Sequence, residues 1–254
     1  MQLKKVFFYF ILCFSIAKAD KVESILNSFI GIPYRNDGAT GAFGQYTLFS
    51  NQKQVFKNAG FNCSGFVLEA FRSITNEELS LDEVKVDNFN DSGKKAKMGE
   101  DWDFGYDLIL NITDKFKLKL LLPDATIELD ELMSATEIYK YTKTAKPYQS
   151  IGFYIQDDKT LEFLKNNIKE QTLYLVDMNA NNRVKNYKLS HYHVGIIYRP
   201  TAEKIYYYDA TRANNVNKRN LYDKKEWQLF KKNFSDSKGN KKKFLLFEVD
   251  INKN

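Results

Sequence analysis

Apolar residues recur at helical spacing in three separate segments of the chain. The segment DKVESILNSFIG, residues 20–31, carries apolar residues on one helical face and ends at a glycine. The segment FNCSGFVLEAFR, residues 61–72, has the same spacing, with Asn62 placed to cap the first turn. The segment DDKTLEFLKNNIKE, residues 157–170, repeats the pattern behind a capping aspartate, Asp157. Each of the three segments predicts one helix.

Toward the carboxyl end the spacing changes to that of β-strands. Four segments are rich in aromatic and β-branched residues and are separated by polar breaks: TLYLVDM (172–178), HYHVGIIYR (191–199), KIYYYDAT (204–211) and KKFLLFEVDI (242–251). Helices in the first part of the chain and strands in the second predict an α+β fold with a mainly antiparallel sheet.

The middle of the chain, residues 74–146, is polar and shows no sustained period. Within it, DWDFGYD (101–107) is interpreted as an aromatic loop and ELDELMSATEIYKYTK (128–143) as a helix. We interpret residues 74–146 as a lobe inserted into the domain. No long linker rich in glycine, serine or proline divides the chain, so residues 20–254 are expected to form a single domain.

Residues 1–19 have the organisation of a secretory signal peptide. Lysines precede an apolar run, Val6 to Ala17, that is too short to span a bilayer, and small residues precede Asp20. We expect cleavage before Asp20 and export of residues 20–254 to a periplasm, a cell wall or the medium. No stable membrane insertion is expected after cleavage.

Removal of this leader changes the charge of the chain. Three of the 38 basic residues and none of the 32 acidic ones lie in the leader, so the net charge falls from +6 to +3. The lysines are scattered, and the densest run, Lys241 to Lys243, is interpreted as a solvated turn. A nucleic-acid partner is therefore not expected.

Cys63 stands at the beginning of a predicted helix and is the one cysteine that remains after removal of the leader, because Cys13 lies within it. An exported chain with a single thiol cannot form an internal disulfide. Burial as a small apolar residue is one explanation for this cysteine. Catalysis is the other, because a helix amino terminus lowers the pKa of a thiol and its N–H groups can stabilise an oxyanion.

The two histidines of the chain, His191 and His193, both lie at the start of a predicted strand, where alternation places them on one face. An imidazole beside a thiol can activate it and later protonate the leaving group. Asp209, near the end of the next predicted strand, is the preferred group to orient that imidazole, and Asp177 and Asn179 are its rivals. Surface histidines and a turn aspartate remain the structural alternative.

A metal site is not expected from these residues. His191 and His193 with one distant cysteine match none of the usual zinc spacings, and the sequence HExxH does not occur. No cofactor is expected either.

Four short segments, taken together, resemble one family: GIPY (31–34), NCSGFV (62–67), HVGIIY (193–198) and YYDAT (207–211). Their order is similar to that of the NlpC-type cell-wall cysteine peptidases, a papain-like superfamily. Those proteins have a G-x-P-Y loop, a D-C-S-G-F helix start, an H-V-G-I strand and a polar residue on the following strand. In this chain Asn62 stands at the position of the aspartate, and the glycine-aspartate pair that usually opens the strand before H-V-G-I is absent.

The resemblance implies a papain-like fold and a set of site residues. Cys63 would be the nucleophile, His193 the base and then the acid, and Asp209 the polar third residue. The hydroxyl of Tyr34 would lie beside the nucleophile and assist the oxyanion. The candidates for oxyanion and substrate binding are Tyr34, Ser64 and His191.

The resemblance also implies an activity, namely hydrolysis of peptide or amide bonds in the peptidoglycan stem by a monomer without a cofactor. Two alternatives stay open. One is a papain-like acyltransferase or effector that acts on a protein or lipid outside the wall, and the other is a non-catalytic module that binds the cell envelope.

Overall fold

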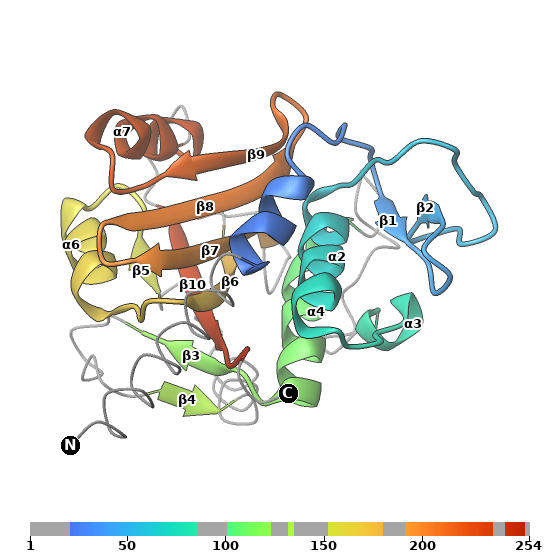
Figure 1. Cartoon of the computed structure of the whole chain (residues 1–254), viewed down its shortest axis with the longest axis horizontal. Helices are drawn as coiled ribbons and strands as arrows, with labels where there is room; N and C mark the ends of the chain where they lie inside the picture. The colour runs from blue at the N-terminus through green and yellow to red at the C-terminus, as the bar shows by residue number, and fades with distance from the viewer. Residues whose placement is uncertain are drawn as a thin grey trace, which may run out of the picture.

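A large antiparallel sheet forms the centre of the protein (Figure 1). The structure, a computed structural model, describes residues 21–85, 101–122, 132–134, 152–179, 191–235 and 242–251. The strand order of the sheet is β4 (Leu132–Ser134), β3 (Lys119–Leu121), β10 (Lys243–Val249), β6 (Thr172–Asn179), β7 (His191–Thr201), β8 (Lys204–Thr211) and β9 (Asn215–Asn220), with β5 (Phe153–Tyr154) paired to β10. All of these pairings are antiparallel.

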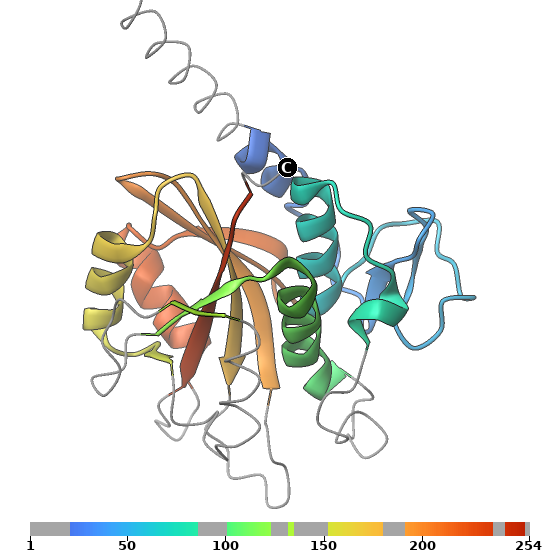
Figure 2. The same cartoon turned by 90° about the horizontal axis from the view of Figure 1, so that it is seen from below.

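Helices cover both faces of this sheet, as Figure 2 shows. One face packs against α2 (Cys63–Thr75) and α4 (Asp101–Phe116), and the other against α6 (Asp158–Asn167) and α7 (Lys224–Asn233). A short helix, α3 (Leu81–Val84), contacts α4. The predicted α+β fold with a mainly antiparallel sheet is confirmed.

Strand β6 shows how the sheet divides the interior into two hydrophobic clusters. Leu173 and Leu175 belong to the cluster beneath α2 and α4, whereas Tyr174 and Val176 belong to the cluster beneath α6 and α7. Successive side chains of a strand point to opposite faces, so a strand buried on both faces must be apolar at nearly every position. This explains why the central strands were recognisable as apolar runs.

The start of α2 is fixed by a cap and by a close backbone contact. The side-chain oxygen of Asn62 accepts a hydrogen bond of 2.7 Å from the N–H of Gly65, which confirms the predicted cap. A Cβ atom at Gly65 would overlap the carbonyl oxygen of Gly38, in the small hairpin of β1 (Gly38–Thr40) and β2 (Tyr46–Leu48). The first turn of α2 therefore rests directly on the backbone of β1.

Two other helix predictions are also confirmed. Residues 21–28 form a helix, which ends before Gly31, a residue with a positive φ of 87°. The side chain of Asp157 accepts a hydrogen bond of 2.9 Å from the N–H of Lys159 and caps α6 as expected.

The middle of the chain differs from the interpretation of its sequence. Helix α4 begins at Asp101, where an aromatic loop was expected, and β4 lies within residues 128–143, where a helix was expected. Helix α4 is stable here because Leu108, Ile109 and Ile112 are buried against the sheet. The rest of residues 123–151 lies outside the described residues.

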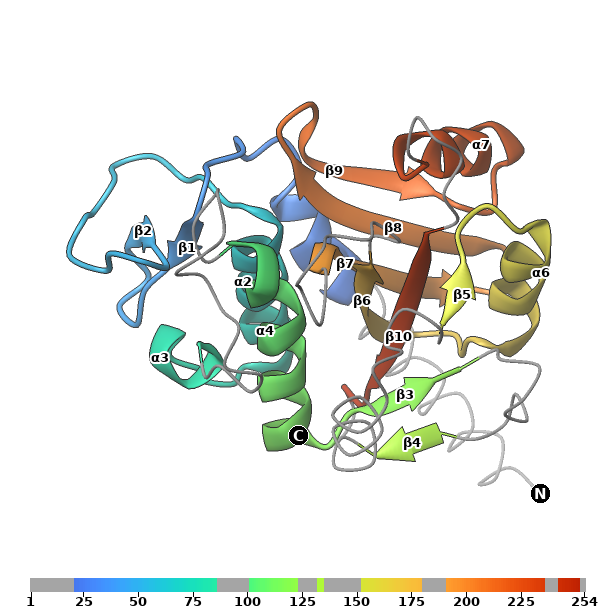
Figure 3. The same ribbon diagram turned by 180° about the vertical axis from the view of Figure 1, so that it is seen from behind.

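The described part of residues 74–146 is built into the main core. Strands β3 and β4 extend the sheet beside β10, as Figure 3 shows, and α4 packs against α2, β6 and β7. Residues of α4 and β3 belong to the hydrophobic cluster on one face of the sheet, so this part of the expected inserted lobe contributes to the core.

The lysine run near the carboxyl end is not a solvated turn. Lys242 and Lys243 are buried, and β10 begins at Lys243. The ammonium of Lys243 lies 4.3 Å from the ring centre of Tyr154, and the N–H of Lys242 donates a hydrogen bond to the side chain of Gln156. Pairing with β5 covers the lysine stems, which is the reason for their burial.

The expected signal peptide, residues 1–19 with Cys13, and Lys241 lie outside the described residues. Within the part of the chain that the structure describes, no helix combines the length and the apolar composition needed to cross a membrane.

Candidate active site

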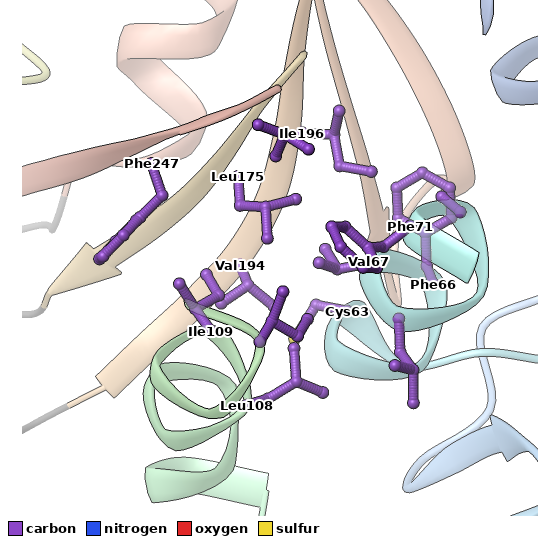
Figure 4. Packing of buried hydrophobic residues seen from close by; sticks show 14 of the residues in the cluster. Cys63, Phe66, Val67, Phe71, Leu108, Ile109, Leu175, Val194, Ile196 and Phe247 are labelled. Atoms are coloured by element: carbon purple, nitrogen blue, oxygen red, sulfur yellow. The ribbon is translucent and has the colours of Figure 1, made fainter. Parts of the chain in front are cut away.

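Cys63 is the first residue of α2 and is nearly buried, with 8% of its surface exposed. Figure 4 shows it beside Leu108 of α4 and Val194 of β7. The first turn of α2 contains no acidic residue. Since the first N–H groups of a helix have no acceptor within it, this position favours a negative charge on the sulfur.

His193 and Asp209 are brought together by neighbouring strands. Nε2 of His193 lies 2.7 Å from Oδ2 of Asp209, and the two side chains are on β7 and β8. Both residues are buried, His193 with 8% and Asp209 with 1% of the surface exposed. A hydrogen bond that is shielded from water in this way holds the imidazole in one orientation.

The rival residues do not take this place. Asp177 is buried on β6 opposite Val194, whereas Met178 is the partner of His193 across the same pair of strands. By the alternation of the strand, Asp177 points to the face opposite to that of Met178 and His193. The side chain of Asn179 lies outside the described residues.

The imidazole of His193 lies between two groups that favour its protonated form. Burial lowers the pKa of His193, but hydrogen bonds to Asp209 and Cys63 and the negative charge of both groups raise it, to about 10. Because Asp209 takes Nε2, Nδ1 is the nitrogen that remains for the thiol of Cys63. The protonated imidazole of His193 therefore interacts with both Cys63 and Asp209.

Two further side chains complete the surroundings of this imidazole, and the sequence did not single out either of them. Nδ2 of Asn217 on β9 donates a hydrogen bond of 2.6 Å to Oδ1 of Asp209. The ring of Phe234, at the end of α7, stacks on His193 with 5.4 Å between ring centres and 27° between the planes.

The sequence contained a signal for only one of these two residues. Trp227, Phe230 and Phe234 are all buried and recur at helical spacing, which predicts the apolar face of a helix. Strand β9 has the sequence NVNKRN, in which only Val216 is apolar. Without alternating apolar residues, the sequence could not predict a strand here or the face to which Asn217 points.

The loop that contains Tyr34 runs between β9 and the entry to α2. Gly31 and Ile32 exchange backbone hydrogen bonds with Val216 of β9, and Tyr34 forms a parallel bridge with Phe61. The backbone of this loop therefore lies beside the segment that leads into Cys63. The assistance of its hydroxyl to an oxyanion stays a prediction.

Ser64 and His191 differ in how well they are placed. The side chain of Ser64 is fully buried, and its hydroxyl has no hydrogen-bond partner among the described residues. His191 begins β7, opposite Asn179, and its side chain lies outside the described residues. The roles of both residues in binding stay predictions.

The glycine of the HVGIIY segment has a packing role. A Cβ atom at Gly195 would come within 2.6 Å of the ring of Tyr207, which lies across it from β8. Only a residue without a side chain lets this ring cover the strand, so Gly195 keeps β7 and β8 close together beside His193.

Comparisons with known proteins add no relative. No model of a protein family, no curated protein and no solved structure matches the chain. Within the described residues, no group of three or more histidine, cysteine, aspartate or glutamate side chains is arranged to hold a metal ion.

The raised pKa of His193 predicts how the stability of the protein depends on pH. The pKa of His193 is about 10 in the folded chain, whereas the ordinary pKa of a histidine is 6.5. The contribution of this group to stability is therefore complete below pH 6.5 and is lost as the pH rises through about 10. A free thiol is already ionised above about pH 8.5, so His193 alone accounts for the change in this pair above that value.

We expect the free energy of unfolding to fall by about 2 kcal/mol between about pH 8.5 and pH 10. Urea unfolding of residues 20–254 at several pH values measures it, with His193→Gln as the control that lacks the titrating group. Equal slopes for the two proteins would contradict the prediction.

Proposed function

We propose that the chain is an exported cysteine hydrolase that cleaves peptide or amide bonds in the peptidoglycan stem through an acyl-enzyme at Cys63. The observation that carries the proposal is the imidazole of His193, which interacts with Cys63 on one side and Asp209 on the other. A cysteine at a helix amino terminus with a buried imidazole and an orienting carboxylate is the arrangement that acyl transfer requires.

The papain-like fold is part of this proposal. Three features support it: a helix that begins at the cysteine, an antiparallel sheet against which that helix packs, and the two other candidate residues on adjacent strands of that sheet. The GIPY, NCSGFV, HVGIIY and YYDAT segments support the NlpC-type assignment and hence the cell-wall substrate. Export through the predicted signal peptide would bring the enzyme to that substrate.

The reaction begins when the thiolate of Cys63 attacks the acyl carbon of the substrate. The carbonyl oxygen becomes an oxyanion, which N–H groups of the first turn of α2 can stabilise. The imidazolium of His193 then gives its proton to the nitrogen of the breaking C–N bond, and the amine leaves a thioester on Cys63.

Hydrolysis of the thioester restores the enzyme. The neutral imidazole of His193 takes a proton from water, and the resulting hydroxide attacks the acyl carbon. The carbon–sulfur bond breaks, the new carboxylic acid leaves, and the thiolate and imidazolium are formed again. Asp209 holds the imidazole in the orientation that both steps require.

Digestion of isolated peptidoglycan by residues 20–254 tests this function. Mass spectrometry of the muropeptides is expected to show new fragments in which one bond of the stem peptide has been cleaved. An unchanged fragment profile would contradict the proposed substrate. Labelling of Cys63 by a thiol-reactive activity probe without fragment release would instead support the acyltransferase or effector reading.

A further inference from the structure

Asn217 is placed on the far side of the Asp209 carboxylate from His193. The two residues are direct partners across β8 and β9. Nδ2 of Asn217 lies 2.6 Å from Oδ1 of Asp209, while Oδ2 of the same carboxylate lies 2.7 Å from His193. Each carboxylate oxygen is thus held by a different strand.

The amide of Asn217 is itself fixed in orientation. Nδ2 also lies 3.3 Å from the backbone carbonyl oxygen of Asp209. Both neighbours of this nitrogen are acceptors, so the amino group and not the carbonyl of the side chain must face Asp209. A buried carboxylate oxygen needs a donor, and among the described residues Asn217 supplies the one that Oδ1 accepts.

We propose that Asn217 is a positioning residue of the candidate site: its side-chain amide holds the Asp209 carboxylate so that Oδ2 stays directed at His193. This inference rests on the proposed function, because it assigns Asn217 a role in holding the imidazolium beside Cys63. Without the amide, the carboxylate is free to turn about its terminal bond toward any other donor.

Two further contacts near this pair of residues involve α7 and the residue that follows it. Arg219 of β9 pairs with Glu226 of α7 at 3.7 Å, and Phe234, directly after α7, covers the imidazole ring. The interactions described for the imidazole of His193 are those with Asp209 of β8, with Cys63 of α2 and with the ring of Phe234.

The test is the pH dependence of Cys63 alkylation by iodoacetamide. Residues 20–254 contain no other cysteine, so the reaction reports this thiol directly. Two variants remove the donor without adding a charge: Asn217→Ala shortens the side chain, and Asn217→Leu keeps a similar size without the polar group. Asn220→Leu, on the same strand, loses an amide that bonds the N–H of Tyr222, and serves as the matched control.

The thiolate is the form that reacts, and the ordinary pKa of a thiol is about 8.5. In the wild type, the alkylation rate is expected to remain high well below this pH. Both Asn217 variants are expected to move the inflection upward by about one pH unit, and Asn220→Leu is expected to leave it unchanged. Thermal melting checks that each variant is folded, and Asn217→Ala, which adds neither bulk nor charge, keeps the test informative if Asn217→Leu is not folded.

The outcomes separate the two proposals. A low wild-type inflection that both Asn217 variants retain would overturn the role of Asn217 and leave the proposed function standing. A wild-type inflection near the value of a free thiol would overturn the proposed function, and the role of Asn217 with it.

Discussion

Replacement of Cys63 by alanine is expected to lower the release of stem-peptide fragments by more than about 10³-fold, because the proposed acyl-enzyme forms on the sulfur of Cys63. The comparison uses the initial rate of fragment release from isolated peptidoglycan, measured by mass spectrometry. Labelling by a thiol-reactive probe should be lost in the same variant. The small side chain of alanine fits the nearly buried position, so the fold should be retained.

Two control variants sharpen the Cys63 experiment. Cys63→Ser keeps the geometry with a weaker nucleophile and should release fragments far more slowly than the wild type. Ser73→Ala changes an exposed residue of the same helix and should leave the rate as it is. Equal release by Cys63→Ala and the wild type would mean that the hydrolysis does not proceed through this cysteine.

Replacement of Asp209 by alanine is expected to lower kcat/KM by about 10²- to 10⁴-fold, the range that general acid–base catalysis contributes. The reason is the loss of the 2.7 Å contact that orients His193 and favours its protonated form. Asp209→Asn keeps a polar group at this position without the charge and is expected to lose less. The difference in kcat/KM between these two variants separates the contribution of the Asp209 charge from its contribution to the orientation of His193.

Asp177→Asn is the matched comparison for Asp209. Asp177 is also a buried aspartate on a strand next to β7, but alternation directs it to the other face. Its substitution should leave the rate of fragment release near that of the wild type, with thermal melting to confirm the fold. A larger loss of rate in Asp177→Asn than in Asp209→Ala would contradict this assignment and would identify Asp177 as the residue that orients His193.

The elements whose residues repeat a regular period could be predicted from the sequence. Strands β6, β7, β8 and β10 were recognisable because they are buried and therefore apolar along most of their length. The caps at Asn62 and Asp157 were recognisable because capping is a local interaction between neighbours in the chain. The caps depend on contacts within a few residues, and burial on both faces leaves a run of apolar residues that is visible in the sequence of each strand.

Elements stabilised mainly by distant partners could not be predicted in the same way. Strand β9 is polar and is held by its backbone pairing with β8, so its sequence resembles a loop. Helix α4 begins in a segment with glycine and aromatic residues, and packing of Leu108 and Ile109 against the sheet supports it. Tertiary packing outweighs local propensity in both cases.

The amino-acid sequence by itself determined that Cys63 begins a capped helix and that His193 and Asp209 lie on successive strands. It could not decide between Asp177 and Asp209, because β6 and β8 both flank β7. That choice, and the contact of Asn217 with Asp209, depended on strand register, which sets the face to which each side chain points. Register arises from hydrogen bonds between residues far apart in the chain, so only the tertiary structure could supply it.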